Sequence, residues 1–184
     1  MPKQIPFVDL HTQYLSIKEE IDAAIAQVIA QSSFLRGPEV LEFEKNFSRK
    51  LGVKHTVSCA NGTDALYIAL KALGAGPGDE VITTAHSWIS TSEAITQTGA
   101  EVVFCDTGRD DFLIDVSQVE KLITPKTKGI IPVHLYGQAV DMDPLQEIAE
   151  KHNLWILEDC AQAHLAKYKD QFVGTFGDAA TFSF

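Results

Sequence analysis

Short β-branched runs alternate with helical stretches from residue 54 onward, and this alternation restricts the possible folds more than any other feature of the chain. Parallel strands must be joined by long crossovers, which helices usually supply. The pattern therefore predicts an α/β fold in which helices flank a mostly parallel sheet. The strand candidates are "HTVSC" (55–59), "DEVITT" (79–84), "AEVVFCD" (100–106), "KGIIPV" (128–133) and "LWILED" (154–159), and the helical candidates between them are 62–74, 87–99, 116–123 and 143–153.

Two amphipathic patterns precede this region and predict helices over 16–31 and 37–52. We therefore expect a helical segment over 1–53 and an α/β domain over 54–184. The final run, "GTFGDAATFSF", predicts a turn into a strand, and a sheet strand is a poor place for a natural chain to stop. The expectation is a longer protein of which these 184 residues are the front part.

Charge and cysteine content exclude several classes of partner. The formal net charge of −10 argues against nucleic acid, whose phosphates require clustered Lys and Arg. The N-terminus lacks a signal-peptide pattern, and no apolar run approaches the roughly 18 residues of a membrane span. The three cysteines are widely separated without CxxC spacing, which predicts neither a disulfide framework nor a metal site. A cytoplasmic location fits this composition.

Polar residues at four strand ends form the candidate site, because ligands of open α/β sheets bind beyond the carboxyl ends of the strands. The four places are Gly62 and Thr63 in "SCANGTDAL", Trp88 in "AHSWIST", Asp159 and Gln162 in "EDCAQAH", and Ser183 in "FSF". Each has a plainer interpretation. The first could be an ordinary helix cap by Asn61 or Thr63, Trp88 could be core, Asp159 could cap a helix, and Ser183 in a strand indicates little by itself. The nearby His164 could likewise be a structural hydrogen-bonding residue.

Taken together, the four places match one ligand. A helix N-terminus with a glycine and a hydroxyl can hold a phosphate, and an indole can stack on a flat ring. A carboxylate can keep a pyridine nitrogen protonated by stabilising its charged form. These are the needs of pyridoxal 5'-phosphate, whose protonated ring acts as an electron sink. No metal site is expected, because His86, His134 and His164 lack the paired spacing of zinc ligands.

The chain also resembles the DegT/DnrJ/EryC1/StrS aminotransferases, pyridoxal phosphate enzymes of fold type I. The likeness rests on "PFVDL", "FLRGPEVLEFEKNF", "SCANGTDALYIAL", "PGDEVITT", "ITPKTKGIIPVHLYGQAVDMDPLQEIAEKHNLWILEDCAQAH" and "GTFGDAATFSF", and it extends in order from about residue 5 to the last residue.

Carried over by position, the resemblance implies cofactor contacts at six residues. The phosphate would lie at Gly62, Thr63 and Ser183, the ring under Trp88, the ring nitrogen at Asp159, and the phenolic oxygen near Gln162. His134 and Tyr136 would support the site, and the loop with Arg36 and Gly37 would border the substrate.

Two departures from the family pattern stand out. Leu165 occupies a position where many relatives have Gly, which we interpret as a tolerated loop change. The family's Schiff-base lysine is expected about four residues beyond Phe184, and the small C-terminal domain is also absent from these residues. The 184-residue chain alone is therefore expected to be inactive.

The resemblance implies a reaction for the full-length protein. It would transfer an amino group from an amino acid, by resemblance L-glutamate, to a nucleotide-linked keto-deoxysugar, and it would act as a homodimer in polysaccharide or other sugar biosynthesis. One alternative is a sugar dehydratase with His in place of the lysine. Another is a truncated, non-catalytic fragment.

Overall fold

The computed structural model describes residues 5–184, which divide into two compact units between Phe47 and Ser48. The first unit contains helices α1 (Leu10–Ser16), α2 (Lys18–Gln31) and most of α3 (Pro38–Leu51). Proline suits the first position of α3, because it lacks the N–H that a first turn leaves unused. The helices expected over 16–31 and 37–52 are confirmed, while a domain boundary between residues 53 and 54 stays a prediction.

A five-stranded parallel sheet forms the centre of the second unit, in the order β2-β1-β3-β4-β7. Its strands are β1 (Glu80–Thr84), β2 (Glu101–Cys105), β3 (Thr127–Ile131), β4 (Trp155–Asp159) and β7 (Ala179–Thr181). The predicted α/β fold and four of the five strand candidates are thereby confirmed. The strand expected over 55–59 is wrong, since this segment pairs with no strand of the described residues. Its β-branched composition favours extended backbone but does not supply a neighbouring strand to pair with.

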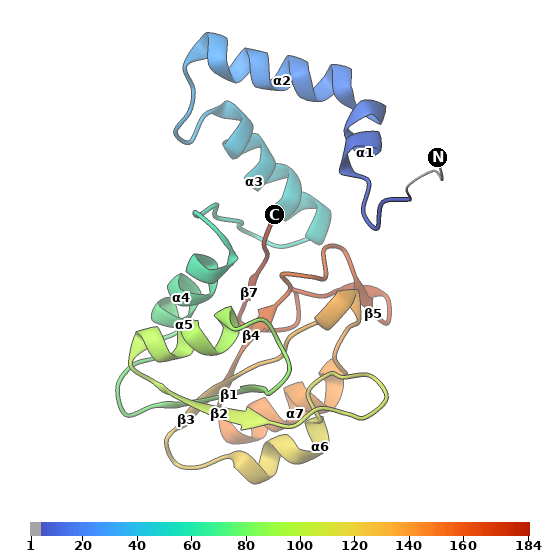
Figure 1. Ribbon diagram of the computed structural model, residues 1–184. Coiled ribbons are helices and arrows are strands. Elements are labelled where there is room, and N and C mark those ends of the chain that lie inside the picture. Colours follow the sequence, from blue (N-terminus) through green and yellow to red (C-terminus); the bar gives the residue numbers. More distant parts are fainter. Residues whose placement is uncertain (1–4) are drawn as a thin grey trace. The chain divides into compact units, whose positions relative to one another are not determined.

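Helices cover both faces of this sheet (Figure 1). Leu157 of β4 packs with residues of α4 (Gly62–Ala72) and α5 (Ser90–Thr98) on one face. Ile156, the preceding residue, packs with residues of α6 (Val116–Val119) and α7 (Met142–His152) on the other. This is the two-residue period of a strand buried on both sides.

The same alternation separates the two carboxylates at the end of β4. Asp159 follows the parity of Leu157 and contacts Thr91 of α5, whereas Glu158 follows Ile156 and contacts the loop after residue 173. Adjacent acidic residues therefore have different surroundings and different tasks.

Smaller elements complete the unit. They are the 3-10 turns η1 (Glu120–Leu122) and η2 (Leu135–Gly137) and a hairpin of β5 (Lys167–Tyr168) with β6 (Gln171–Phe172). The sequence patterns did not predict the hairpin, whereas η1 lies within the helix expected over 116–123. Among residues 5–184, no helix has both the length and the apolar character that a membrane crossing requires.

Candidate functional site

The first turn of α4 forms one end of the site. Asn61 has extended backbone and caps this helix, since its Oδ1 accepts the Asp64 N–H at 2.9 Å. The cap interpretation of Asn61 is therefore confirmed, and it is compatible with anion binding. The cap provides an acceptor for the backbone N–H of Asp64. The N–H groups of Gly62 and Thr63 precede the first intrahelical bonds and lie at the positive end of the helix dipole.

Ser183 lies directly against Gly62. A Cβ built on Gly62 would stand 2.7 Å from the Ser183 Cβ and 2.9 Å from its Oγ. Residue 62 must therefore lack a side chain for the segment after β7 to reach the start of α4. Two of the six predicted residues, far apart in the sequence, are brought together in this way.

Thr63 connects the start of α4 to α5. Its Oγ1 lies 2.7 Å from the Oγ of Ser90, a hydrogen bond in which either hydroxyl can be the donor. Ser90 is buried, with 9% of its surface exposed.

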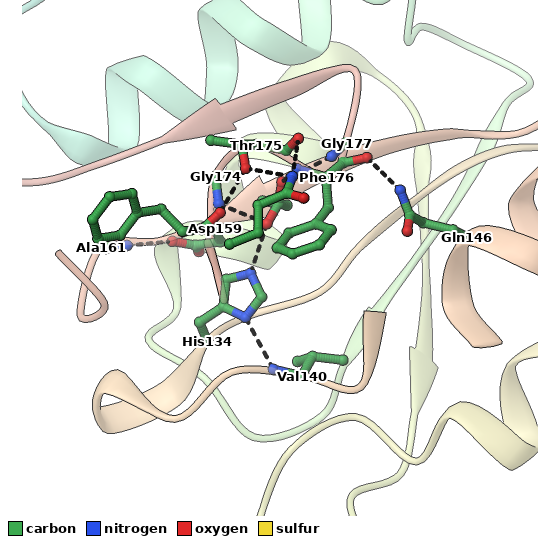
Figure 2. Close-up of polar contacts among 12 residues, drawn as sticks. His134, Val140, Gln146, Asp159, Ala161, Gly174, Thr175, Phe176 and Gly177 are labelled. Atoms are coloured by element: carbon green, nitrogen blue, oxygen red, sulfur yellow. Dashed lines mark hydrogen bonds and ion pairs between the residues drawn. The ribbon is translucent and has the colours of Figure 1, made fainter. Parts of the chain in front are cut away.

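Asp159 lies at the end of β4 and is only 3% exposed. Its Oδ2 accepts the Thr91 hydroxyl at 2.8 Å. Its Oδ1 accepts the Ala161 N–H at 3.2 Å (Figure 2). Burial raises the pKa of Asp159 above its ordinary value, and these two hydrogen bonds oppose the rise only in part. The helix-cap alternative is wrong for Asp159, because the bond to Ala161 closes a turn and no helix follows it.

Gln162 is oriented by the η2 turn. The Tyr136 N–H donates to its Oε1 at 2.9 Å, so the side-chain oxygen faces Tyr136 and the Nε2 group remains a donor. Tyr136 has left-handed backbone, with φ 55°, and is 75% exposed.

Trp88 lies just before α5 and is 74% exposed, so its interpretation as ordinary core is wrong. Its carbonyl accepts the Thr91 N–H at 3.3 Å, which ties the backbone of Trp88 to the same helix that contacts Asp159 and Thr63.

Thr181 is a further polar residue that the sequence patterns did not single out. It pairs with Asp159 in the parallel register of β4 and β7, is 5% exposed, and its Oγ1 has no hydrogen-bond partner among the described residues. A buried hydroxyl without a partner is unfavourable unless something else bonds it. This hydroxyl fits a site that accepts a polar ligand.

Glu158 anchors the loop between β6 and β7. It is fully buried, and its two oxygens accept N–H groups from Gly174 at 2.7 Å, Phe176 at 2.7 Å and Gly177 at 2.8 Å. His134 Nε2 lies 3.0 Å from the Glu158 Oε2 and its Nδ1 accepts the Val140 N–H at 3.1 Å (Figure 2). Since Nδ1 is an acceptor, the Nε2 hydrogen points to the carboxylate.

The atoms of His134, Glu158 and Cys160 lie within 4.8 Å of one another, close enough in principle to bind a metal ion. Both carboxylate oxygens and both imidazole nitrogens already have hydrogen-bond partners. Burial and the neighbouring carboxylates also raise the pKa of the Cys160 thiol well above its ordinary value, which disfavours the thiolate that a metal requires. The arrangement is accounted for by structural hydrogen bonds.

The loop after Asp159 contains His164 and Leu165, both of which were also considered from the sequence. His164 packs against the rings of Phe182 and Phe184, with centroids 5.9 Å and 4.6 Å away, which supports a structural role. Leu165 has φ 60°, a left-handed conformation that glycine adopts without strain. Arg36 and Gly37 belong to the first unit, where Arg36 forms an ion pair with Glu44 at 3.2 Å.

Comparison with known proteins places these residues in context. The pattern that defines the DegT/DnrJ/EryC1/StrS aminotransferase family matches residues 15–184. The chain is 47% identical to a pleiotropic regulatory protein of Geobacillus stearothermophilus over 98% of its own length and 48% of that protein. It is 44% identical to the dTDP-3-amino-3,4,6-trideoxy-alpha-D-glucose transaminase of Streptomyces venezuelae, again over 98% of the chain and 48% of the relative.

Among solved structures, NtdA of Bacillus subtilis with its bound cofactor PMP matches with a TM-score of 0.90 and 34% identity. This match covers 100% of the chain and 42% of NtdA. The chain thus spans about half the length of the curated relatives it matches.

Proposed function

Because the chain belongs to the DegT/DnrJ/EryC1/StrS aminotransferase family, we propose that it binds pyridoxal 5'-phosphate and provides the cofactor-binding half of a sugar aminotransferase. The whole protein would transfer an amino group from an amino acid, L-glutamate, to a nucleotide-linked keto-deoxysugar. The named transaminase of Streptomyces venezuelae supports the substrate class, and NtdA with its bound PMP supports the cofactor. Assembly as a homodimer and a cytoplasmic location stay predictions.

The phosphate would bind at the start of α4. The N–H groups of Gly62 and Thr63 and the hydroxyls of Thr63 and Ser183 provide donors, and the helix dipole favours an anion there. The contact between Gly62 and Ser183 places these donors on two segments that meet at one point.

The ring nitrogen would pair with Asp159, and this carboxylate is the observation that carries the proposal. A buried acidic group with a raised pKa is held in an unfavourable charged state, and a protonated heterocycle would relieve it. When bound, the cofactor supplies an electron sink for the carbon that carries the amino group. Asp159 would keep that sink protonated throughout the reaction.

Two further residues would orient the ring. The Nε2 group of Gln162 is the donor left after Tyr136 occupies its oxygen, so it suits an acceptor such as the cofactor's phenolic oxygen. Trp88 exposes its indole beside α5, and an aromatic face can stack on the pyridine ring.

Titration calorimetry of the full chain with pyridoxamine 5'-phosphate tests this proposal, because that compound has no aldehyde and binds without a covalent bond. We expect pyridoxamine 5'-phosphate to bind saturably. Pyridoxamine, which lacks the phosphate, should bind at least about tenfold more weakly. Equal affinity for the two compounds, or no binding of either, would contradict the proposed cofactor site.

A further inference from the structure

The hydroxyl residues of α5 fall into two groups. Ser92, Thr96 and Thr98 donate to carbonyl groups of their own helix, at 3.0 Å to Ile89, 3.1 Å to Ser92 and 2.7 Å to Ile95. Ser90 and Thr91 instead reach outward, to Thr63 of α4 and to Asp159 of β4. Side chains that bond within the helix are the common arrangement for Ser and Thr, so the outward pair requires a separate explanation.

Capping does not explain Ser90 and Thr91. Ile89 occupies the N-cap position of α5 and makes no side-chain cap bond, so neither hydroxyl satisfies the helix end. Thr91 is only 2% exposed, which means that its hydroxyl is committed to the protein interior. Ser and Thr also stabilise a helix less than Ala does. Their presence here therefore points to the groups that they contact.

We propose that Ser90 and Thr91 are positioning residues through which the first turn of α5 orients both polar anchors of the cofactor site, the Thr63 hydroxyl and the Asp159 carboxylate. This inference rests on the proposed function. It adds two residues that make no contact with the cofactor themselves but determine how the contacting groups are presented.

Hydrogen counting fixes the direction of the contacts on Asp159. A carboxylate has no hydrogen, so the Thr91 hydroxyl must donate to Oδ2. Ser87 Oγ lies 3.0 Å from Thr91 Oγ1, and it must be the donor of that bond because the Thr91 hydrogen is already used. Ser87, Thr91 and Asp159 thus form a one-way chain of donors that ends on the carboxylate.

Both carboxylate oxygens are held by this arrangement. Thr91 occupies one side of Oδ2 and the Ala161 N–H occupies one side of Oδ1, so the plane of the carboxylate cannot rotate freely. The other titratable groups nearby are Glu158, Cys160 and His134. The His134 side chain bonds Glu158, and its backbone N–H donates to the Asp159 carbonyl oxygen rather than to the carboxylate. Thr91 is therefore the side chain that sets the orientation of Asp159.

The same logic applies at the phosphate end. If Ser90 donates to Thr63, the Thr63 hydroxyl keeps its own hydrogen for an acceptor. An anion at the start of α4 selects this arrangement, since the anion can only accept. Removal of the Ser90 hydroxyl would leave Thr63 free to rotate away.

The two roles predict different binding defects, which calorimetry with pyridoxamine 5'-phosphate and pyridoxamine separates. Ser90→Ala should weaken the binding of pyridoxamine 5'-phosphate about threefold to tenfold and leave the affinity for pyridoxamine unchanged, because only the phosphate contact is affected. Thr91→Val should weaken both ligands by a similar factor, about tenfold. Thr91→Ser should behave as the unchanged protein, and Thr96→Val is the matched control on the same helix.

A second measurement needs no ligand. Titration of the Asp159 carboxyl carbon by NMR should give a pKa about one unit higher in Thr91→Val than in the unchanged protein, since a donor to the charged form is lost. Ser87→Ala, which keeps the Thr91 side chain in place, should shift it in the same direction by less. If Thr91→Val does not fold, the Asp159 pKa in Ser87→Ala alone tests the positioning role.

The outcomes separate the two proposals. If the unchanged protein fails to bind pyridoxamine 5'-phosphate, the proposed function is wrong. If it binds normally but the Asp159 pKa is the same in Thr91→Val, or in Ser87→Ala where Thr91→Val is unfolded, the positioning role is wrong and the proposed function stands.

Discussion

Gly62 and Ser183 approach so closely that a methyl group on residue 62 would stand 2.7 Å from the Ser183 Cβ. The contact joins the first turn of α4 to the segment after β7, across almost the whole length of the second unit's sequence. It links two of the predicted phosphate-binding residues that are distant in sequence, and it can be tested directly.

Gly62→Ala should destabilise the protein by about 1–3 kcal/mol, because the added Cβ forces two segments apart, although alanine favours helix more than glycine. Chemical denaturation measures the change. Gly76→Ala is the matched control, since a Cβ there would meet nothing within 4 Å. Ser183→Gly in the Gly62→Ala background should recover part of the loss, and a double variant no better than Gly62→Ala would contradict the contact.

Asp159→Asn should stabilise the ligand-free protein at neutral pH and weaken the binding of pyridoxamine 5'-phosphate at least about tenfold. The folded pKa of Asp159 is raised, so its stability contribution is full below the unfolded pKa of about 3.9 and is lost as pH rises through the folded value. The advantage of the Asn variant should therefore grow above about pH 4. Denaturation at a series of pH values measures it, and an advantage that shrinks with rising pH would contradict the sign.

The hydroxyls around Asp159 explain why an amide can be accommodated in the Asp159→Asn variant. The amide oxygen can still accept the Ala161 N–H, and the amide nitrogen can donate to Thr91 if the Thr91 hydroxyl turns toward Ser87. The bond between Ser87 and Thr91 can reverse because each hydroxyl both donates and accepts. Thr91→Val combined with Asp159→Asn should lose part of the stability gain.

Leu165→Gly should stabilise the protein by about 1 kcal/mol, because the left-handed backbone at φ 60° strains a residue with a Cβ. Leu165 is 41% exposed, so the apolar burial lost is smaller than for a core leucine. Thermal denaturation gives the comparison. Leu165→Ala keeps the Cβ and serves as the control, and an equal gain in that variant would show that strain is not the cause.

Glu158→Gln should destabilise the protein by about 3 kcal/mol or more, since an amide nitrogen would face backbone N–H donors in a fully buried position. Glu120→Gln is a surface control for which a much smaller effect is expected. Equal unfolding midpoints for the two variants in denaturant would contradict the anchoring role of Glu158.

Glu120 should show the pH dependence opposite to that of Asp159. Hydrogen bonds from His152 and Lys151, at 2.8 Å and 2.6 Å, lower the pKa of Glu120 from 4.5 to about 2. Its contribution is therefore present above pH 4.5 and disappears as pH falls toward 2. The difference in stability between Glu120→Gln and the unchanged protein should vanish over that window and should also decrease with added salt.

Local pattern was sufficient for most of the fold. The runs around Val81, Val102 and Ile156 contain enough β-branched and apolar residues to predict buried strands, and the helical periodicity between them predicts the crossovers. The segment 55–59 has a similar composition but is not a strand in the part of the chain that the structure describes, and the hairpin of β5 and β6 is too short for a periodic signal. Pairing depends on residues distant in sequence, which composition does not encode.

From the sequence alone, Asp159 and Ser183 could be selected because strand ends converge at one edge of a parallel sheet. Gly62 could be selected because it begins a predicted helix, although the strand expected before it does not form. Only the tertiary structure decided which contacts these side chains make. It gave Glu158 and Asp159 different hydrogen-bond partners and oriented Gln162 through Tyr136. It also placed Ser90 and Thr91 against two different elements. Each depends on which atoms come within about 3 Å of one another, and hydrogen bonds distinguish such distances while sequence spacing does not.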